Sequence, residues 1–113
     1  IELYGVTGGR LDHFFAVMCL LEKYQDVSIK VIDQQNCIQL LKPGIHHIEN
    51  KGYYYFSLFA LNESSLSIKQ AEYTLDHYLL KREDPLCVSN EVKGEYAIIE
   101  NSGNILLIQS RDA

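Results

Sequence analysis

The opening stretch of the sequence changes its hydrophobic period twice. Residues 1–5 alternate in part and are β-prone, and residues 6–9 then give a turn signal. From Arg10 onward, apolar residues recur at helical spacings as far as Leu21 and form a wide apolar face. Residues 27–32 alternate apolar and polar side chains, which is typical of a strand. The pattern therefore predicts one strand–helix–strand unit whose two strands run parallel with a right-handed crossover.

After residue 33 the sequence consists of short β-prone runs separated by turn residues. The asparagine–lysine–glycine step at 50–52 is a good hairpin turn, and residues 101–104 join the final two runs. Residues 72–80 fit either a strand or a helical turn. The other predicted strands are 37–41, 45–48, 53–61, 66–68, 86–88, 92–100 and 104–110. Many short strands with glycine and asparagine turns indicate an antiparallel β-sandwich or a barrel.

These two sequence patterns together predict an α+β fold that is mainly β. We expect residues 1–34 to form the terminal βαβ piece of an α/β domain and residues 35–113 to form the β-sandwich. A parallel pair with one helix leaves a sheet face and both sheet edges uncovered, whereas parallel sheets are normally buried on both faces. We therefore expect earlier strands of the α/β domain to lie upstream of residue 1.

Composition and charge narrow the classes of function. The chain has 113 residues, 47% of them hydrophobic, and a net charge of −5, which is typical of one soluble domain. The absence of a basic run argues against nucleic-acid binding, and no apolar run approaches the roughly 18 residues of a membrane span. Cys19, Cys37 and Cys87 have no metal or disulfide spacing, so reduced thiols in a cytoplasmic protein are the better interpretation.

The richest candidate site lies between the first predicted strand and the helix. Its residues are Thr7, Gly8, Gly9, Arg10 and Asp12. Open α/β sheets bind ligands at this place, and the free N–H groups of a helix start favour anions. Arg10 could pair with a phosphate through its planar fork, and Asp12 could hold a magnesium ion. A plain tight turn, with Asp12 as a partner of the helix dipole, explains the same residues equally well.

A second candidate is the step Ser89-Asn90-Glu91 between two predicted strands. Its hydroxyl, amide and carboxylate suit the recognition of a polar heterocycle, although a polar turn is the simpler interpretation on these residues alone. The histidines receive no role, because the adjacent pair would point to opposite strand faces, which is poor geometry for one metal ion. They are His13, His46, His47 and His77.

The segment from Val6 to His13 resembles the Gly-Ala-Thr-Gly-Gly-Arg-Leu-Asp-His signature of the thiamine pyrophosphokinases, or thiamine diphosphokinases. Later parts are similar to this family in the same order, and the resemblance covers essentially the whole chain. These parts are 20–21, 32–36, 55–61, 89–91 and 106–112. The glycine turn and the serine–asparagine–glutamate step are specific together, and the glutamate is the bacterial form. The chain therefore resembles the C-terminal part of a bacterial member.

The resemblance implies transfer of a pyrophosphoryl group from ATP to thiamine, with magnesium, to give thiamine diphosphate and AMP. It also implies an α/β domain, a thiamine-binding β-sandwich and a homodimer whose active site lies between domains of two subunits. By position, Arg10 and Asp12 match the family's active-site Arg-x-Asp, with Asp12 on magnesium and residues 7–10 at the nucleotide. Ser89 and Asn90 match its thiamine-contacting turn.

The family's aspartate-rich segment, which supplies further metal ligands, does not occur in these residues. We therefore expect this chain to have little or no activity alone. Two other hypotheses are a non-catalytic module that binds thiamine or another heterocycle, and a structural dimerisation domain. The enzyme hypothesis depends on one expectation: the glycine turn and the serine–asparagine corner line a single cavity, within one chain or across two copies.

Overall fold

The computed structural model describes residues 2–4, 11–26 and 28–111, with the backbone alone at residues 3 and 11–15. The helix is α1 (Leu11–Lys23). The strands are β1 (Glu2–Tyr4), β2 (Lys30–Ile32), β3 (Asn36–Leu41), β4 (Gly44–Ile48), β5 (Tyr55–Ala60), β6 (Ser64–Lys69), β7 (Leu75–Leu80), β8 (Ala97–Asn101) and β9 (Ile105–Ser110). Among the residues that the structure describes, no helix has the length and apolar character needed to span a membrane.

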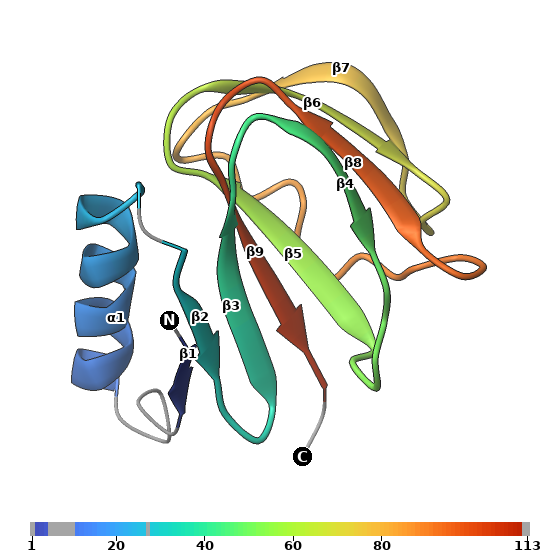
Figure 1. Ribbon diagram of the computed structural model, residues 1–113. Helices are drawn as coiled ribbons and strands as arrows, with labels where there is room; N and C mark the ends of the chain where they lie inside the picture. The colour runs from blue at the N-terminus through green and yellow to red at the C-terminus, as the bar shows by residue number, and fades with distance from the viewer. Residues whose placement is uncertain (1, 5–10, 27, 112–113) are drawn as a thin grey trace.

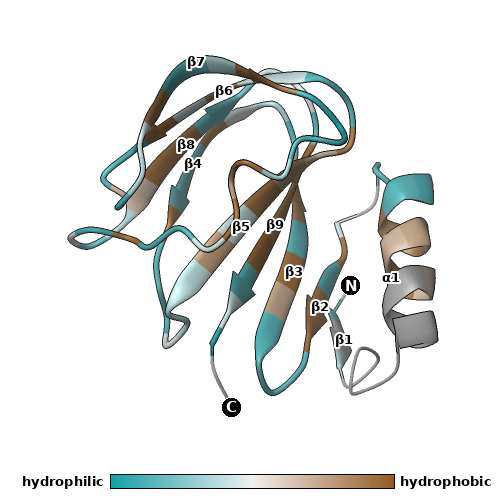
Figure 2. Ribbon diagram, turned by 180° about the vertical axis from the view of Figure 1, so that it is seen from behind, coloured by the Kyte–Doolittle hydropathy of each residue, from teal (hydrophilic) through white to brown (hydrophobic). Residues whose placement is uncertain are grey.

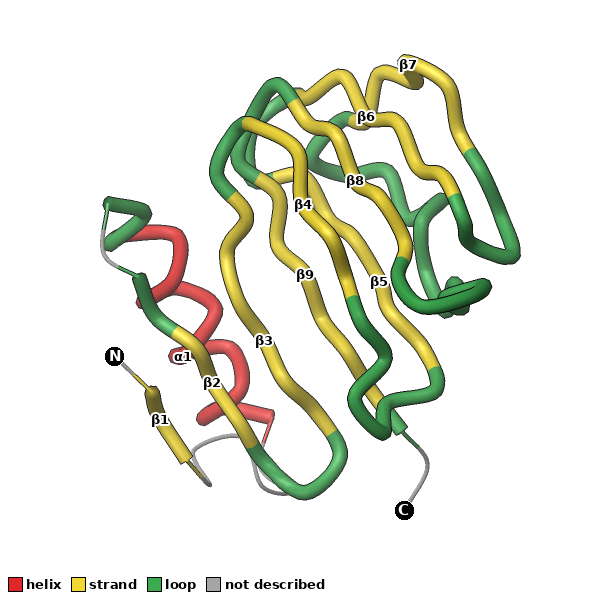
Figure 3. Tube along the Cα trace, turned by 45° about the vertical axis from the view of Figure 1, so that its right-hand side comes forward, coloured by secondary structure: helices red, strands yellow, loops and turns green. Residues whose placement is uncertain are grey.

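Two sheets form a β-sandwich with the helix on its outside (Figure 1). The five-stranded sheet has the order β1-β2-β3-β9-β5, and the four-stranded sheet has the order β4-β8-β6-β7. The strands β1 and β2 run parallel, and all other strand pairs are antiparallel. Figure 3 shows α1 against the β1–β3 side of the five-stranded sheet. The predicted strand–helix–strand unit with parallel strands and the antiparallel β-sandwich are both confirmed.

The strand β9 explains how the five-stranded sheet packs on both of its faces. Leu106 belongs to the apolar cluster that includes Leu21 of α1, whereas Ile105 and Leu107 belong to the core between the sheets. The side chains of Ile105, Leu106 and Leu107 are all fully buried, and most of the strand is brown in Figure 2. Successive side chains of a strand point to opposite faces, so a strand that is covered on both faces reads as a continuous apolar run.

The strand β3 covers one of the sheet edges that the sequence predicts to be open. It pairs antiparallel with β2, so the expectation that both edges of the βαβ unit lack a partner is wrong. The chain reverses at Asp33, whose Oδ1 accepts hydrogen bonds from the backbone N–H groups of Gln35 (2.8 Å) and Asn36 (2.7 Å). The sheet is therefore continuous across residue 34, and the division into two domains there stays a prediction.

Two of the expected strands differ from the structure. Residues 86–88 form no strand: the N–H of Leu86 donates to Asp84 Oδ1 at 3.0 Å, which is a local turn bond. The strand β8 begins at Ala97, five residues after the expected start at residue 92, because the chain turns at Gly94 with φ of 84°. Of the two interpretations of residues 72–80, the strand is the one found, as β7.

Candidate functional site

The glycine-turn residues lie outside the part of the chain that the structure describes. This holds for Thr7, Gly8, Gly9 and Arg10, and for the side chain of Asp12, whose backbone lies in the first turn of α1. The frame around the turn is described: β1 precedes it and α1 follows it, as the sequence predicts. The roles of these residues stay predictions.

The Ser89–Asn90 corner joins the two sheets. The backbone N–H of Asn90 donates to the carbonyl of Phe56 and its carbonyl accepts from the N–H of Phe56, both at 2.8 Å, which ties it to β5. The N–H of Ser89 donates to Ser57 Oγ at 2.9 Å. Ser89 itself is exposed with φ of 60°, an uncommon conformation for a residue with a side chain. The corner therefore carries an exposed serine on a backbone that hydrogen bonds from Ser89 and Asn90 hold to β5.

The side chain of Asn90 turns toward the opposite sheet and binds Tyr73. Its Oδ1 accepts a hydrogen bond from the N–H of Tyr73 at 2.9 Å, and its Nδ2 donates to the carbonyl of Tyr73 at 2.7 Å. Oδ1 also accepts from the N–H of Glu91 at 2.9 Å. The side chain is almost completely enclosed, since Asn90 is 3% exposed. These bonds satisfy the buried amide and link the corner to the connection between β6 and β7.

A cavity of about 430 Å³ lies beside this corner. It is lined by Ile68, Tyr73, Leu75, Leu86, Cys87, Val88 and Asn90. Most of the lining is apolar, one side is aromatic, and the polar corner lies at its border, which is the usual composition of a small-ligand pocket. Burial, with a smaller effect of Asp84, raises the pKa of the Cys87 thiol to about 11, so this thiol is neutral in the cavity wall at physiological pH.

Sequence reasoning missed the apolar members of this cavity. Tyr73 precedes the corner by 17 residues, and only the pairing between the two segments brings it there. Leu86 and Val88 directly precede the corner and are exposed apolar residues in a segment that forms no strand. Because the sequence pattern predicts a strand at 86–88, it carries no signal that these side chains line a cavity.

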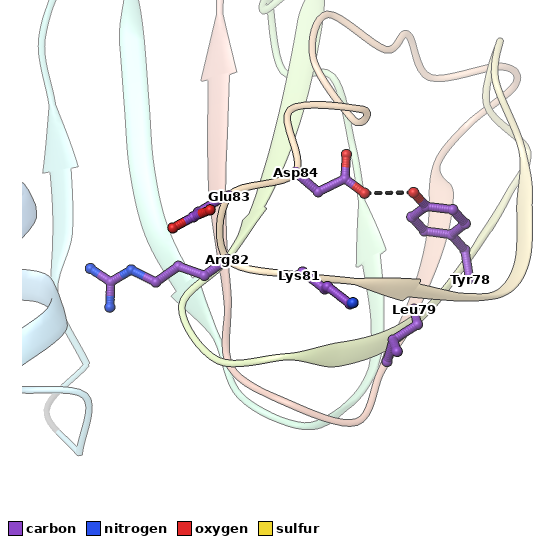
Figure 4. A pocket seen from close by; sticks show the side chains of 6 residues that line it. All are labelled: Tyr78, Leu79, Lys81, Arg82, Glu83 and Asp84. Atoms are coloured by element: carbon purple, nitrogen blue, oxygen red, sulfur yellow. Dashed lines mark hydrogen bonds between the residues drawn. The ribbon is translucent and has the colours of Figure 1, made fainter.

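A second cavity, of about 620 Å³, lies at the end of β7 and is mainly charged (Figure 4). The hydroxyl of Tyr78 donates to Asp84 Oδ2 at 2.5 Å, and this hydrogen bond raises the pKa of Tyr78. Arg82 points away from this pair and binds Glu22 of α1. The hydroxyl of Tyr78, the carboxylate of Asp84 and the guanidinium of Arg82 thus already have partners, so this cavity is a weaker candidate for a ligand site.

The three described histidines, His46, His47 and His77, each have a local partner. These contacts are His46 Nε2 with the Lys42 carbonyl (2.7 Å), the His47 ring stacked on Tyr96 (4.5 Å between centroids), and His77 Nδ1 with Asp76 Oδ1 (2.6 Å). The side chain of His13 is outside the described set. Within that set, no group of three or more His, Cys, Asp or Glu residues could hold a metal ion.

The described neighbours of the two predicted sites lie at opposite edges of one sheet. The strand β1, which leads into the glycine turn, is one edge of the five-stranded sheet, and Asn90 pairs with Phe56 of β5 at the other edge. Four strand spacings of about 4.8 Å separate β1 from β5 by about 19 Å. The glycine turn itself lies outside the described residues, so the expectation of a cavity shared with the corner stays a prediction.

A β-sandwich with an apolar, partly aromatic pocket beside a polar corner has the composition that is typical of a domain with a small-ligand site. The family model described as "Thiamin pyrophosphokinase, vitamin B1 binding domain" matches residues 45–106, which include the whole pocket. The chain belongs to the thiamin pyrophosphokinase family.

Individual relatives agree with this assignment. The chain is 34% identical to the thiamine pyrophosphokinase of Bacillus subtilis (strain 168), over 99% of this chain and 55% of that protein. The crystal structure of the Bacillus subtilis enzyme has a TM-score of 0.89 at 32% identity, covering 100% of this chain and 56% of that chain. The enzyme from Geobacillus thermodenitrificans has a TM-score of 0.87 at 33% identity, covering 100% and 54%. This chain thus spans about half the length of the relatives it matches.

Proposed function

We propose that the protein is a thiamine diphosphokinase, which transfers a pyrophosphoryl group from ATP to the hydroxyl of thiamine and releases AMP. The single observation that carries this proposal is the family match over the β-sandwich, which includes the pocket between Tyr73 and Asn90. The chain covers 55% of its Bacillus subtilis relative. Within the enzyme, it would therefore supply the β-sandwich and one strand–helix–strand unit.

The pocket beside the corner is proposed as the thiamine site. Thiamine consists of an aminopyrimidine ring and a cationic thiazolium ring, and both can lie against an aromatic face. Tyr73 supplies such a face, and the aliphatic wall formed by Leu75 and Val88 covers apolar ring edges. Ser89 offers an exposed hydroxyl to the aminopyrimidine, and Asn90 keeps one N–H that no described residue uses. The volume of about 430 Å³ suits a ligand of this size.

The phosphate chemistry is proposed for the glycine turn. Arg10 and the backbone of Thr7, Gly8 and Gly9 would hold phosphate oxygens of ATP at the start of α1. Asp12 would bind magnesium, which neutralises phosphate charge when it is bound. One carboxylate is too few for a magnesium site, and the described residues add no cluster to it. The remaining ligands would come from the part of the enzyme that corresponds to the other half of its relatives.

The separation of β1 from the Asn90 corner supports a homodimer. Because β1 and the Asn90 corner lie at opposite edges of one sheet, thiamine at the corner reaches the glycine turn more readily from a second subunit. We therefore propose that the active site forms between the β-sandwich of one subunit and the glycine turn of its partner. A cytoplasmic location fits the free and buried thiols of Cys37 and Cys87.

The test is an assay of AMP and thiamine diphosphate formation by the protein at its natural length. We expect both products in equal amounts, and little or none from residues 1–113 alone. Tyr73→Ala is expected to raise the KM for thiamine about tenfold, because loss of an aromatic contact to a ring cation removes about 1.4 kcal/mol. Tyr54→Ala is the matched control, since Tyr54 is 65% exposed against 66% for Tyr73 but lines none of the cavities described above.

Three outcomes would contradict the proposal. Thiamine binding by the natural-length protein without any AMP release would favour the non-catalytic binding module. Equal turnover by residues 1–113 and the natural-length protein would show that one chain of this length contains the complete active site. An unchanged KM in Tyr73→Ala would place thiamine elsewhere.

A further inference from the structure

We propose that Asn90 is a positioning residue that holds the backbone of Tyr73, so that the tyrosine ring forms the aromatic wall of the pocket. This inference rests on the proposed thiamine site. It assigns Asn90 a role through another residue, which differs from the direct contact with thiamine that the sequence resemblance implies.

The first observation is that one side chain binds both peptide groups of a single residue. Asn90 Oδ1 accepts from the N–H of Tyr73 at 2.9 Å, while Asn90 Nδ2 donates to the carbonyl of the same residue at 2.7 Å. A strand neighbour makes this pair of bonds with its own N–H and carbonyl. The planar amide of Asn90 therefore takes the place of a peptide unit of a neighbouring strand.

The second observation is that this pair lies at the end of a short antiparallel ladder. The segments 70–72 and 91–93 run antiparallel, with bonds from Glu72 N–H to the Glu91 carbonyl and from Lys93 N–H to the Gln70 carbonyl, each at 2.8 Å. In this register Tyr73 stands opposite Asn90 at a position where a regular ladder makes no backbone bond. The backbone of Asn90 pairs with Phe56 of β5 instead, and its side chain binds the peptide groups of Tyr73 that the ladder leaves unpaired. Asn90 thus connects β5 with the segment between β6 and β7.

The third observation concerns Tyr73 itself. The residue is 66% exposed although it lines the cavity, so packing around its ring fixes its position only weakly. The position of the ring then depends on the position of its backbone. Among the described residues, the bonds to the backbone N–H and carbonyl of Tyr73 come from Asn90. Loss of the Asn90 amide would release the aromatic wall while the apolar wall stays in place.

The bonding of Asn90 leaves little for a substrate. Oδ1 already accepts two hydrogen bonds, from Tyr73 and Glu91, and one N–H of Nδ2 is used. One N–H of a side chain that is 3% exposed remains. Two of the three hydrogen bonds of the amide thus hold Tyr73, and a direct contact with thiamine could use only the one remaining N–H.

The test is a double-mutant cycle in the natural-length protein with Asn90→Ala, Tyr73→Ala and both together. We expect Asn90→Ala to raise the KM for thiamine about tenfold, as Tyr73→Ala does, with kcat and the KM for ATP nearly unchanged. Because both substitutions remove the same wall, the double variant should bind thiamine no more weakly than Tyr73→Ala. Asn62→Ala, at an exposed asparagine outside the pocket, is the control and should change nothing.

Multiplied effects, with a KM about a hundredfold higher in the double variant, would overturn the inference and assign Asn90 a direct contact with substrate. A lower melting temperature with an unchanged KM for thiamine would leave Asn90 with a merely structural role. If Asn90→Ala does not fold, Asn90→Asp keeps the size and the acceptor of the side chain but loses the donor to Tyr73. It should show the same rise in KM, and an unchanged KM would again contradict the inference.

The same cycle separates this inference from the proposed function. If calorimetry shows that the protein binds thiamine but the assay shows no AMP release, the enzyme proposal fails. The inference on Asn90 is then tested by measuring the Kd for thiamine of the same three variants. If it neither turns over nor binds thiamine, both proposals are wrong.

Discussion

Glu22 and Arg82 form a bidentate ion pair that joins α1 to the segment after β7, across 60 positions of the sequence. Arg82 Nη1 donates to Glu22 Oε1, and Nη2 donates to Oε2 at 2.9 Å. The neighbouring carboxylate holds the pKa of Arg82 above its ordinary value. The pair thus connects the helix on one side of the sandwich with the charged cavity at the end of β7 (Figure 4).

We expect this ion pair to make a small, salt-dependent contribution to stability, because both side chains are in contact with solvent. Arg82→Ala should lower the free energy of unfolding slightly at low salt and hardly at all at high salt. The measurement is urea unfolding at two ionic strengths. Glu22→Arg combined with Arg82→Glu reverses the pair and should restore the parent's stability at low salt, whereas a loss as large as in Arg82→Ala would contradict the prediction.

A second prediction concerns alkaline pH and Cys87. Burial raises the pKa of this thiol from 9.0 to about 11 in the folded chain. Between these values the unfolded chain loses the thiol proton while the folded chain keeps it, so stability is complete below pH 9.0 and falls as pH rises to about 11. Cys87→Ala should show a shallower fall of the unfolding free energy over this window than its parent does.

Cys19→Ala is the matched control for that measurement, because Cys19 is the exposed thiol of the three. If the unfolding free energy of Cys87→Ala falls as steeply with pH as that of the parent, the loss of stability at alkaline pH has another origin. Thiol labelling gives an independent check: Cys19 should react in the folded chain, and Cys37 and Cys87 should react only after unfolding.

A third prediction concerns the close approach at Gly103. A Cβ at this position would lie 2.8 Å from the Glu63 carbonyl oxygen and 3.2 Å from Ser64 Cβ. The backbone of Gly103 also donates to Ser64 Oγ at 3.0 Å, so the two segments cannot separate without losing this bond. Gly103→Ala should therefore lower the free energy of unfolding by about 1–3 kcal/mol, measured by urea unfolding.

Gly52→Ala separates this steric effect from backbone strain. Gly52 has φ of 89°, but its nearest neighbour to a new Cβ is Arg111 Nη1 at 3.8 Å. Gly52→Asn should recover part of the loss there, since asparagine tolerates positive φ. Gly103→Asn should recover none, and any recovery would show that strain and not the contact with Glu63 sets the cost.

The sequence predicted the elements whose signal is local. The helical spacing before Leu21 and the continuous apolar run around Leu106 correspond to α1 and β9. The strand expected at residues 86–88 is not found: Leu86 and Val88 are exposed and line a cavity, and the apolar pattern alone cannot distinguish such side chains from those of a buried strand. The edge expected to be open at β2 is covered by β3, since a tight turn at Asp33 was sufficient for pairing.

The candidate site was predictable only in its polar part. Ser89 and Asn90 stand out as neighbours in sequence, and the structure places Asn90 in the wall of a cavity. Tyr73 could not be recognised, because its place depends on pairing with a segment 17 residues away and on an amide that acts as a strand neighbour. Arg10 and Asp12 stay predictions.

The position of β9 between β3 and β5 sets an order on the assembly of the protein. Both neighbours precede β9 along the chain, so neither has its central partner while the ribosome is still adding residues 105–110. Until then the apolar edges of β3 and β5 are open to other chains, and closing the sheet requires long loops to come together. A nascent chain that pauses before Ile105 would therefore be vulnerable to aggregation. Once β9 has been synthesised and has left the ribosome, it would pair with β3 and β5 and cover their open edges.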